Sequence, residues 1–209
     1  MVAKREYTSP TREQGKLETR ERILEAVVRV ILEQGIHAFS VQSVAERSGI
    51  SHRTVYRHFA SREGLIEGLS ESLQESLLAA GLSQPTDAGG WAAYVEPLFE
   101  LFSRSAEELR ASVIAAVALG YQSDSQRETW AEFQEALIVR YPYLATAALR
   151  EAAAVFRLLI SRYSWYVLSV ELTLDAEGSG RAAAWAVAAL LDDLDRRNEA
   201  AANVGSVAG

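Results

Sequence analysis

The sequence predicts an all-α protein, and two observations support this prediction. Apolar residues recur at three- and four-residue steps through most of the 209-residue chain, which is the spacing of one face of an α-helix. No stretch of useful length alternates apolar and polar residues, as a half-buried β-strand would. We expect about nine helices, arranged as a three-helix N-terminal domain and a larger helical domain.

The composition is that of a globular protein, with 49% hydrophobic and 23% charged residues. The sequence has no cysteine, which excludes disulfides and thiolate metal sites. Its longest apolar runs, "VIAAVALG" and "AAAWAVAALL", are shorter than the roughly 20 residues that a membrane span needs. The N-terminal stretch "MVAKREYTSPTREQGK" is polar, unlike a signal peptide. We therefore expect a soluble, cytoplasmic protein without a membrane partner.

The net charge of −7 is unevenly distributed. Residues 1–62 carry 11 Lys and Arg against 7 Asp and Glu, whereas residues 63–209 carry 10 against 21. All three histidines also lie in the first part. A basic segment attached to an acidic body indicates that the first part binds an anion. Chance scatter of surface charge is the alternative explanation.

The first elements follow from where the apolar periodicity begins. Residues 1–17 lack such periodicity, so we expect a disordered or loosely ordered arm. Helical spacing begins near Glu18, and Gly35 stands where a glycine commonly ends a helix. The first helix is therefore predicted from Glu18 to the residues just before Gly35, within an N-terminal domain of residues 18–62.

Two short helices joined by a tight turn are predicted next. Ser40 is a good N-cap for a helix over residues 41–48, and Ser51 is a good N-cap for the following one. Gly49 between them permits the left-handed backbone of a tight turn. This arrangement is typical of a helix-turn-helix motif.

The second of these helices, "SHRTVYRHF", carries most of the chemical information. Val55 and Phe59 are expected to face inward, which leaves the polar and basic side chains on the outer faces. Arg53 and Arg57 are four residues apart and therefore lie on one side of the helix. A guanidinium matches guanine edges and phosphates well, so we predict that this helix enters the major groove of double-stranded DNA. The alternative is an αα-hairpin with a solvated basic face.

The rest of the chain alternates helical stretches with short breaks. Ser61 is predicted to cap a helix that continues to about Ala80, and "GLSQPTDAGG" is a loop. Residues 63–198 form the second domain, and residues 199–209 are expected to be a flexible tail. The later helices are predicted over residues 91–103, 106–119, 125–140, 144–172 and 180–198.

One segment carries a specific combination of spacings, "ILEAVVRVILEQGIHAFSVQSVAERSGISHRTVYRHFASREGLIEGL". Its elements are a helix ending in Gly35, the cap Ser40, the turn Ala45-x-x-x-Gly49, the segment Tyr56-x-His58-Phe59 and the helix start Arg62-Glu63-Gly64-Leu65. Over about residues 20–69 the chain resembles the N-terminal domain of the tetracycline-repressor (TetR) family of transcriptional regulators. Ser40, Val55 and Arg62 stand where Thr, Leu and Lys are commoner in the family, and these differences keep the required chemistry.

The resemblance implies a set of DNA contacts. His58 has an alternative role, because a histidine beside Phe59 could simply stabilise the domain. Ser51 serves chiefly as a cap, and Arg20 near the start of the first helix is a further candidate for a backbone contact. The positions that usually touch phosphates are Ser40, Tyr56, His58 and Arg62. The positions that usually approach base edges are His52, Arg53, Thr54 and Arg57.

The resemblance also implies a second domain that binds a ligand and dimerises. The last two helices would form a four-helix interface, so that a homodimer reads a palindromic operator. Candidates for this interface are Leu158, Tyr166, Ala182, Ala186, Ala189, Leu190 and Leu194. Candidates for the pocket of an unidentified small-molecule effector are Tyr121, Trp130, Phe133, Arg162 and Tyr163. Each of these aromatic residues could instead belong to the core.

The expected function is a repressor that leaves its operator when a small molecule binds. A ligand-independent regulator or an activator with the same DNA-binding module is an alternative. An all-α enzyme or carrier is disfavoured, because the sequence has no HExxH, no phosphate-cradling glycine loop and no GxSxG. We therefore expect no catalytic residue, no metal and no cofactor.

Overall fold

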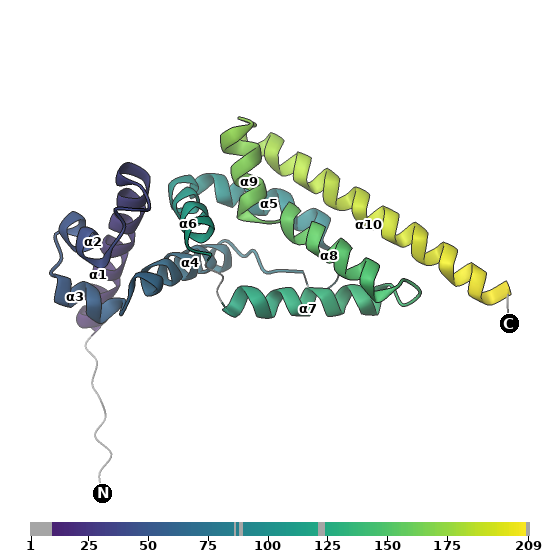
Figure 1. Cartoon of the computed structure of the whole chain (residues 1–209), viewed down its shortest axis with the longest axis horizontal. Coiled ribbons are helices and arrows are strands. Elements are labelled where there is room, and N and C mark those ends of the chain that lie inside the picture. Colours follow the sequence, from purple (N-terminus) through teal and green to yellow (C-terminus); the bar gives the residue numbers. More distant parts are fainter. Residues whose placement is uncertain (1–9, 86, 88–89, 121–123, 208–209) are drawn as a thin grey trace, which may run out of the picture. The chain divides into compact units, whose positions relative to one another are not determined.

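A computed structural model describes residues 10–85, 87, 90–120 and 124–207 (Figure 1). All regular elements in these ranges are helices, which confirms the all-α prediction. Two π-helical segments, η1 (Val30–Gln34) and η3 (Tyr166–Glu171), directly follow α1 and α9. The α-helices are α1 (Pro10–Arg29), α2 (Val41–Ser48), α3 (His52–His58), α4 (Arg62–Ala79), α5 (Trp91–Arg104), α6 (Ala106–Leu119), α7 (Asp124–Arg140), α8 (Thr146–Leu159), α9 (Arg162–Trp165) and α10 (Ala176–Val207).

The chain folds as two compact units. Within the described ranges, the first unit extends to Ser72 and also includes α6 from Arg110 onward, and the second unit holds the rest. The boundaries therefore fall inside α4 and inside α6. We expected the first domain to end at residue 62, but the first turns of α4 belong to it because Leu65 and Leu69 are buried in its core.

The core of the first unit joins α1, η1, α2 and α3 to parts of α4 and α6. Its apolar side chains lie at helical spacing along α1, as the sequence predicted. Burial of each aliphatic side chain of this size stabilises the fold by about 1.5–3 kcal/mol. Large fully buried side chains of the first unit include Ile23, Val27, Ile31, Leu65, Ile66 and Leu69.

Helix α1 begins at Pro10, well before the predicted start at Glu18. Proline is well tolerated in the first turn of a helix, where its missing N–H has no intrahelical partner to lose. The prediction of a loose arm is thus wrong for residues 10–17, and residues 1–9 lie outside the described ranges. The described side chains from Glu13 to Glu18 are all exposed, so this part of the helix leaves no apolar periodicity in the sequence.

The core of the second unit is built where α5, α7, α8 and α10 meet. Helix α10 packs along α5, and Gly180 allows a close approach between them. A Cβ at Gly180 would lie 3.4 Å from the Cα of Glu96. Large fully buried side chains of this unit include Phe99, Leu137, Tyr141, Leu149 and Phe156.

The predicted helix over residues 144–172 is divided in the structure. The Ser161 hydroxyl donates to the Leu158 carbonyl oxygen at 2.7 Å and accepts from the Ser164 N–H at 3.2 Å. The same side chain therefore completes the end of α8 and caps α9.

The last helix is longer than the sequence predicted. It begins at Ala176 and continues to Val207, so the prediction of a flexible tail from residue 199 is wrong through Val207. The Asp175 carboxylate accepts from the Gly178 N–H at 2.6 Å and stabilises the start of the helix. The sequence prediction treated the glycines at the start of this helix as a break, because glycine lowers helix propensity.

Candidate nucleic-acid interface

Helix α2 begins with a reciprocal cap. The Ser40 hydroxyl oxygen accepts from the Ser43 N–H at 3.0 Å, and the Ser43 hydroxyl oxygen accepts from the Ser40 N–H at 2.9 Å. Such a capping box satisfies two N–H groups that the helix leaves without partners. The predicted cap at Ser40 is confirmed, and its phosphate contact stays a prediction.

The turn into α3 has the geometry that the sequence predicted. Gly49 adopts φ 67°, which is the left-handed region that favours glycine. The Ser51 hydroxyl oxygen then accepts from the Thr54 N–H at 3.2 Å, and the two hydroxyls lie 2.9 Å apart. Val55 is fully buried and anchors α3 on the core. These local interactions fix the start of α3 and its packing on the core.

The outer face of α3 presents four exposed side chains, those of His52, Arg53, Tyr56 and Arg57. Tyr56 is 55% exposed, and the His52 ring stacks on it at a centroid distance of 6.0 Å. Within the described part of the chain, neither Arg53 nor Arg57 has a hydrogen bond or an ion pair. The sequence also has no acidic residue between positions 46 and 63. The face is therefore cationic and available to an anion.

Arg22 of α1 and Arg47 of α2 differ from the arginines of α3, because each has a hydrogen-bond partner within the described residues. Arg47 makes two contacts with the Glu33 carboxylate, at 2.5 and 2.6 Å. Arg22 donates to the Ser48 carbonyl oxygen at 3.0 Å, at the end of α2.

Two predicted phosphate contacts, Arg20 and Arg62, are engaged inside the first unit. Arg20 lies 2.8 Å from the Glu71 carboxylate, and its guanidinium sits over the Phe59 ring at 5.8 Å.

Arg62 donates to the Ile36 carbonyl oxygen at 2.9 Å and lies 5.3 Å from the centre of the Phe39 ring. Both Arg20 and Arg62 are half-buried. The structure gives both side chains internal contacts, which residue type alone did not reveal, and their phosphate contacts stay predictions.

A concave surface lies between the N-terminal part of α1 and the end of α3. It has a volume of about 390 Å³ and is lined by Gly15, Lys16, Thr19, Arg57 and His58. Burial lowers the pKa of His58 below its ordinary value, and Arg57, Lys16 and Arg20 lower that pKa further. The concave surface is therefore positively charged even when His58 is neutral.

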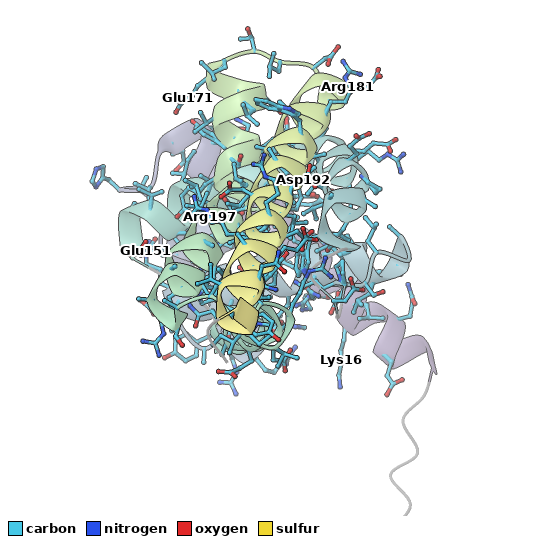
Figure 2. All side chains as sticks on the ribbon, turned by 90° about the vertical axis from the view of Figure 1, so that its right-hand side faces the viewer. Lys16, Glu151, Glu171, Arg181, Asp192 and Arg197 are labelled. Atoms are coloured by element: carbon cyan, nitrogen blue, oxygen red, sulfur yellow. The ribbon has the colours of Figure 1, made fainter. Side chains whose placement is uncertain are left out.

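The α1 side of this surface was not predicted from the sequence. Lys16 was not considered because α1 was predicted to begin only near Glu18, and Thr19 was not considered because the resemblance implies no contact there. The signal was present, since Lys16 stands four residues before Arg20 and so on the same face of a longer helix. Figure 2 shows the Lys16 side chain extending from α1.

Most candidates for the dimer interface lie at the surface of α8, η3 and α10. Leu158 is 61% exposed and Ala189 is exposed. Leu194 is a correction, because it is only 3% exposed and lies with Val187 and Leu191 on the inward face of α10. The half-buried candidates are Tyr166, Ala182, Ala186 and Leu190.

Two exposed apolar residues in this region were not predicted. Trp185 on α10 is 75% exposed, and Val155 on α8 is 47% exposed. Helices α8 and α10 pack against each other, and Glu151 and Asp192 mark them in Figure 2. Trp185 stands one turn from both Arg181 and Ala189, so helical spacing could have identified it as an outward position.

Two of the pocket candidates belong to a packed aromatic cluster. The Phe133 ring lies 4.9 Å from Trp91 and 5.5 Å from Phe156, and Phe133 is only 5% exposed. Trp130 is half-buried, packs on Phe133 at 5.4 Å and is covered by the Arg157 guanidinium at 5.4 Å. Phe133 is therefore a core residue of the second unit.

The other three pocket candidates do not join this cluster. Arg162 and Tyr163 are half-buried at the start of α9. Tyr121 lies outside the described residues. Their role in a pocket stays a prediction.

Two further kinds of site are not found in the described part of the chain. No group of three or more histidines and carboxylates there has the arrangement of a metal site. None of the described helices combines the length and the apolar composition that crossing a bilayer requires.

The first-unit sequence matches a known protein family. Residues 23–69 match the model of the bacterial regulatory proteins, tetR family. The HTH-type transcriptional regulator UidR of Escherichia coli K12 is 30% identical over 105 residues, which are 50% of this chain and 53% of the relative. The uncharacterized HTH-type transcriptional regulator YvkB of Bacillus subtilis 168 is 33% identical over 51 residues, 24% of this chain and 27% of the relative. The chain thus spans about half or less of these relatives.

Solved structures share the fold over most of the chain. A TetR-family transcription regulator from Marinobacter aquaeolei VT8 has a TM-score of 0.55 at 17% identity, covering 84% of this chain and 97% of that one. A transcriptional regulator from Rhodococcus sp. Rha1 has a TM-score of 0.58 at 17% identity, covering 83% and 96%. A SmeT–triclosan complex has a TM-score of 0.54 at 17% identity, covering 82% and 90%.

These comparisons agree with the geometry of α2 and α3. The matched relatives are regulators of transcription, which supports the prediction that the chain is not an enzyme. Residues 23–69 therefore carry a helix-turn-helix domain of the type found in the tetR family of bacterial regulatory proteins.

Proposed function

We propose that this regulator is a homodimeric, cytoplasmic repressor that binds a palindromic operator through α3 and leaves it when a small molecule binds the second unit. The observation that supports the DNA-binding part best is the outer face of α3. There Arg53 and Arg57 are exposed and have no partner within the described residues. Both guanidiniums are therefore available to DNA without breaking an internal ion pair.

The two arginines suit direct readout of guanine. A guanidinium donates two parallel hydrogen bonds to guanine O6 and N7, and each such pair contributes about 1–3 kcal/mol of discrimination. The caps at Ser40 and Ser51 fix both helices of the motif, so the arginines start from a rigid backbone. Tyr56 and Ser40 stay candidates for phosphate contacts that orient α3.

The test begins with selection of bound fragments from random and genomic DNA, followed by gel-shift titration of the enriched duplex. Arg53→Ala and Arg57→Ala should each weaken specific binding by about 1–3 kcal/mol, or roughly 5- to 150-fold. Arg29→Ala is the matched control, because Arg29 is exposed on α1 and pairs only weakly with Glu25 at 3.9 Å. If Arg53→Ala and Arg57→Ala bind the enriched duplex as tightly as Arg29→Ala does, the readout role is rejected.

The homodimer is supported by the apolar surface on α8 and α10. Trp185 and Leu158 are 75% and 61% exposed, and they present apolar surface on two helices that pack against each other. A two-fold symmetric contact would bury both residues from each copy. Trp185→Glu should give a monomer in light scattering, whereas Val139→Glu, on the equally exposed Val139 of α7, should leave the dimer intact. Dimers in both variants would place the interface elsewhere.

Release by a small molecule is supported by similarity to a fold neighbour that is a complex with triclosan. Half-buried Trp130, Arg162 and Tyr163 are the described candidates for contacts with such a molecule. Compounds that raise the melting temperature of the second unit should also release the selected duplex. If no compound binds the regulator, the ligand-independent alternative is favoured. If expression of a reporter gene falls when the regulator is deleted, the activator alternative is favoured.

A further inference from the structure

We propose that the concave surface formed by Gly15, Lys16 and Thr19 of α1 with Arg57 and His58 of α3 binds a phosphate of the DNA backbone, beside the groove that α3 enters. The proposal rests on the proposed DNA-binding function and deepens it. It assigns a DNA contact to the N-terminal part of α1, which lies before the residues 23–69 that match the family model.

The surface has the shape and the donors that a phosphate needs. Its volume of about 390 Å³ leaves ample room for one phosphate group, and Gly15 adds no side chain to narrow it. The Thr19 hydroxyl already donates to the Gly15 carbonyl oxygen at 2.6 Å. Because Arg57 is assigned to base readout, the donors that remain for a phosphate are the Lys16 ammonium and the His58 ring, and Arg57 adds its positive charge.

The charges around the surface all favour an anion. Lys16 and Arg20 on α1 and Arg57 on α3 are the charged groups whose fields reach His58, and no carboxylate lines the surface. Glu71 of α4 is paired with Arg20 at 2.8 Å. A phosphate would offset the mutual repulsion of these cations and favour the protonated form of His58.

The position of Arg57 identifies the source of the phosphate. Arg57 both lines the concave surface and lies one turn from Arg53 on the outer face of α3. An anion bound there is therefore adjacent to the helix that contacts base edges. Backbone phosphates flank the major groove on both sides, and contacts with them set the register of a protein on DNA.

The test is the salt dependence of binding to a short fluorescein-labelled duplex of mixed sequence, measured by anisotropy. The matched pair is Lys16→Gln and Arg29→Gln, which remove the same charge from exposed positions of α1. Removal of a phosphate contact should lower the slope of log K against log salt by about 0.9 for each bound chain. From about 50 to 200 mM salt, the affinity of Lys16→Gln should therefore fall about 3.5-fold less per chain than that of wild type. Arg29→Gln should keep the wild-type slope.

A second measurement addresses His58. At constant ionic strength, wild-type affinity for the duplex should rise as the pH falls from about 8 to about 6, because protonated imidazole donates to phosphate. In His58→Gln the rise in affinity should be smaller than in wild type. The rise that remains in this variant measures the contribution of other groups, including His37 and His52. Circular dichroism verifies that each variant is folded, and Lys16→Gln decides the question if His58→Gln is not.

The outcomes separate the proposal from the function on which it rests. A wild-type slope in Lys16→Gln, together with clear binding of the duplex, would overturn the phosphate site and leave the DNA-binding function standing. Absence of duplex binding by the wild-type chain would overturn both. If inorganic phosphate binds in a Lys16-dependent way while the duplex slope stays unchanged, the surface binds free anions, and the assignment to DNA is wrong.

Discussion

Replacement of Arg62 by alanine separates the two roles that sequence and structure assign to this side chain. The resemblance places Arg62 at a phosphate. In the structure Arg62 is half-buried, donates to the Ile36 carbonyl oxygen at 2.9 Å and covers Phe39. Arg62→Ala should therefore destabilise the first unit and leave the salt slope of DNA binding unchanged.

The magnitude follows from the lost contacts. A hydrogen bond from a charged donor contributes about 1.5–3 kcal/mol, and a partly exposed cation–π contact about 0.5–1 kcal/mol. Removal of a positive charge from the first turn of α4 returns about 0.3–1 kcal/mol, because the helix dipole disfavours a cation there. The net loss is about 2 kcal/mol in the free energy of unfolding, or roughly 30-fold in the folding equilibrium.

The positions of the tryptophans make the assay specific. All four tryptophans, Trp91, Trp130, Trp165 and Trp185, lie in the second unit. Tryptophan fluorescence therefore reports the second unit alone, whereas far-ultraviolet circular dichroism reports both units. A loss of about 2 kcal/mol should lower the melting midpoint of the first unit by about 8–16 °C in the dichroism signal.

The result that would refute this reasoning is equally clear. If Arg62→Ala melts like wild type and its DNA-binding slope falls by about 0.9 per chain, Arg62 is a phosphate contact. The internal hydrogen bond to Ile36 would then contribute nothing measurable. Arg29→Ala serves as the control for loss of charge in both measurements.

Three further predictions concern the cap, the core and a titrating group. Ser40→Ala should lower the stability of the first unit by about 1 kcal/mol, measured by dichroism, because the capping box at α2 is lost; an unchanged midpoint would contradict the cap. Phe133→Ala should cost about 3–5 kcal/mol in a denaturant titration followed by tryptophan fluorescence, and a cost below about 1 kcal/mol would argue that Phe133 lines a cavity rather than packed core. Because the pKa of His58 is lowered in the folded chain, the unfolded chain binds more protons, so wild-type stability should fall as the pH drops from the ordinary histidine pKa toward the lowered one. His58→Gln should show a smaller fall in that window, and an identical fall would exclude His58 as its source.

The helix-turn-helix could be predicted because its determinants are local. Ser40 and Ser51 cap the residues that follow them, and Gly49 adopts the left-handed backbone that its lack of a side chain permits. Interactions of this kind depend on neighbours within four residues, which a sequence displays directly. The same holds for Val55, whose spacing from the turn places it in the core.

The remaining features depend on contacts between distant residues or on the absence of a pattern. The described side chains at the N-terminal part of α1, from Glu13 to Glu18, are all exposed, so no apolar periodicity predicts this part of the helix. Arg20 and Arg62 have the residue type of a phosphate ligand, but their partners Glu71 and Ile36 lie 51 and 26 positions away. Leu194 could not be placed because outward and inward leucines on α10 differ only in what packs against them.

Helix α6 has a consequence for any attempt to transplant the DNA-binding module into another protein. Ala111 and Ala115 are fully buried in the same core as Leu65 and Leu69, although some forty residues of chain separate the two pairs. A fragment ending at Ser72 would retain all of α1, α2 and α3 yet lose one wall of its interior. Such a fragment should be aggregation-prone, and a graft that keeps the module folded has to supply two alanines from a helix encoded far downstream.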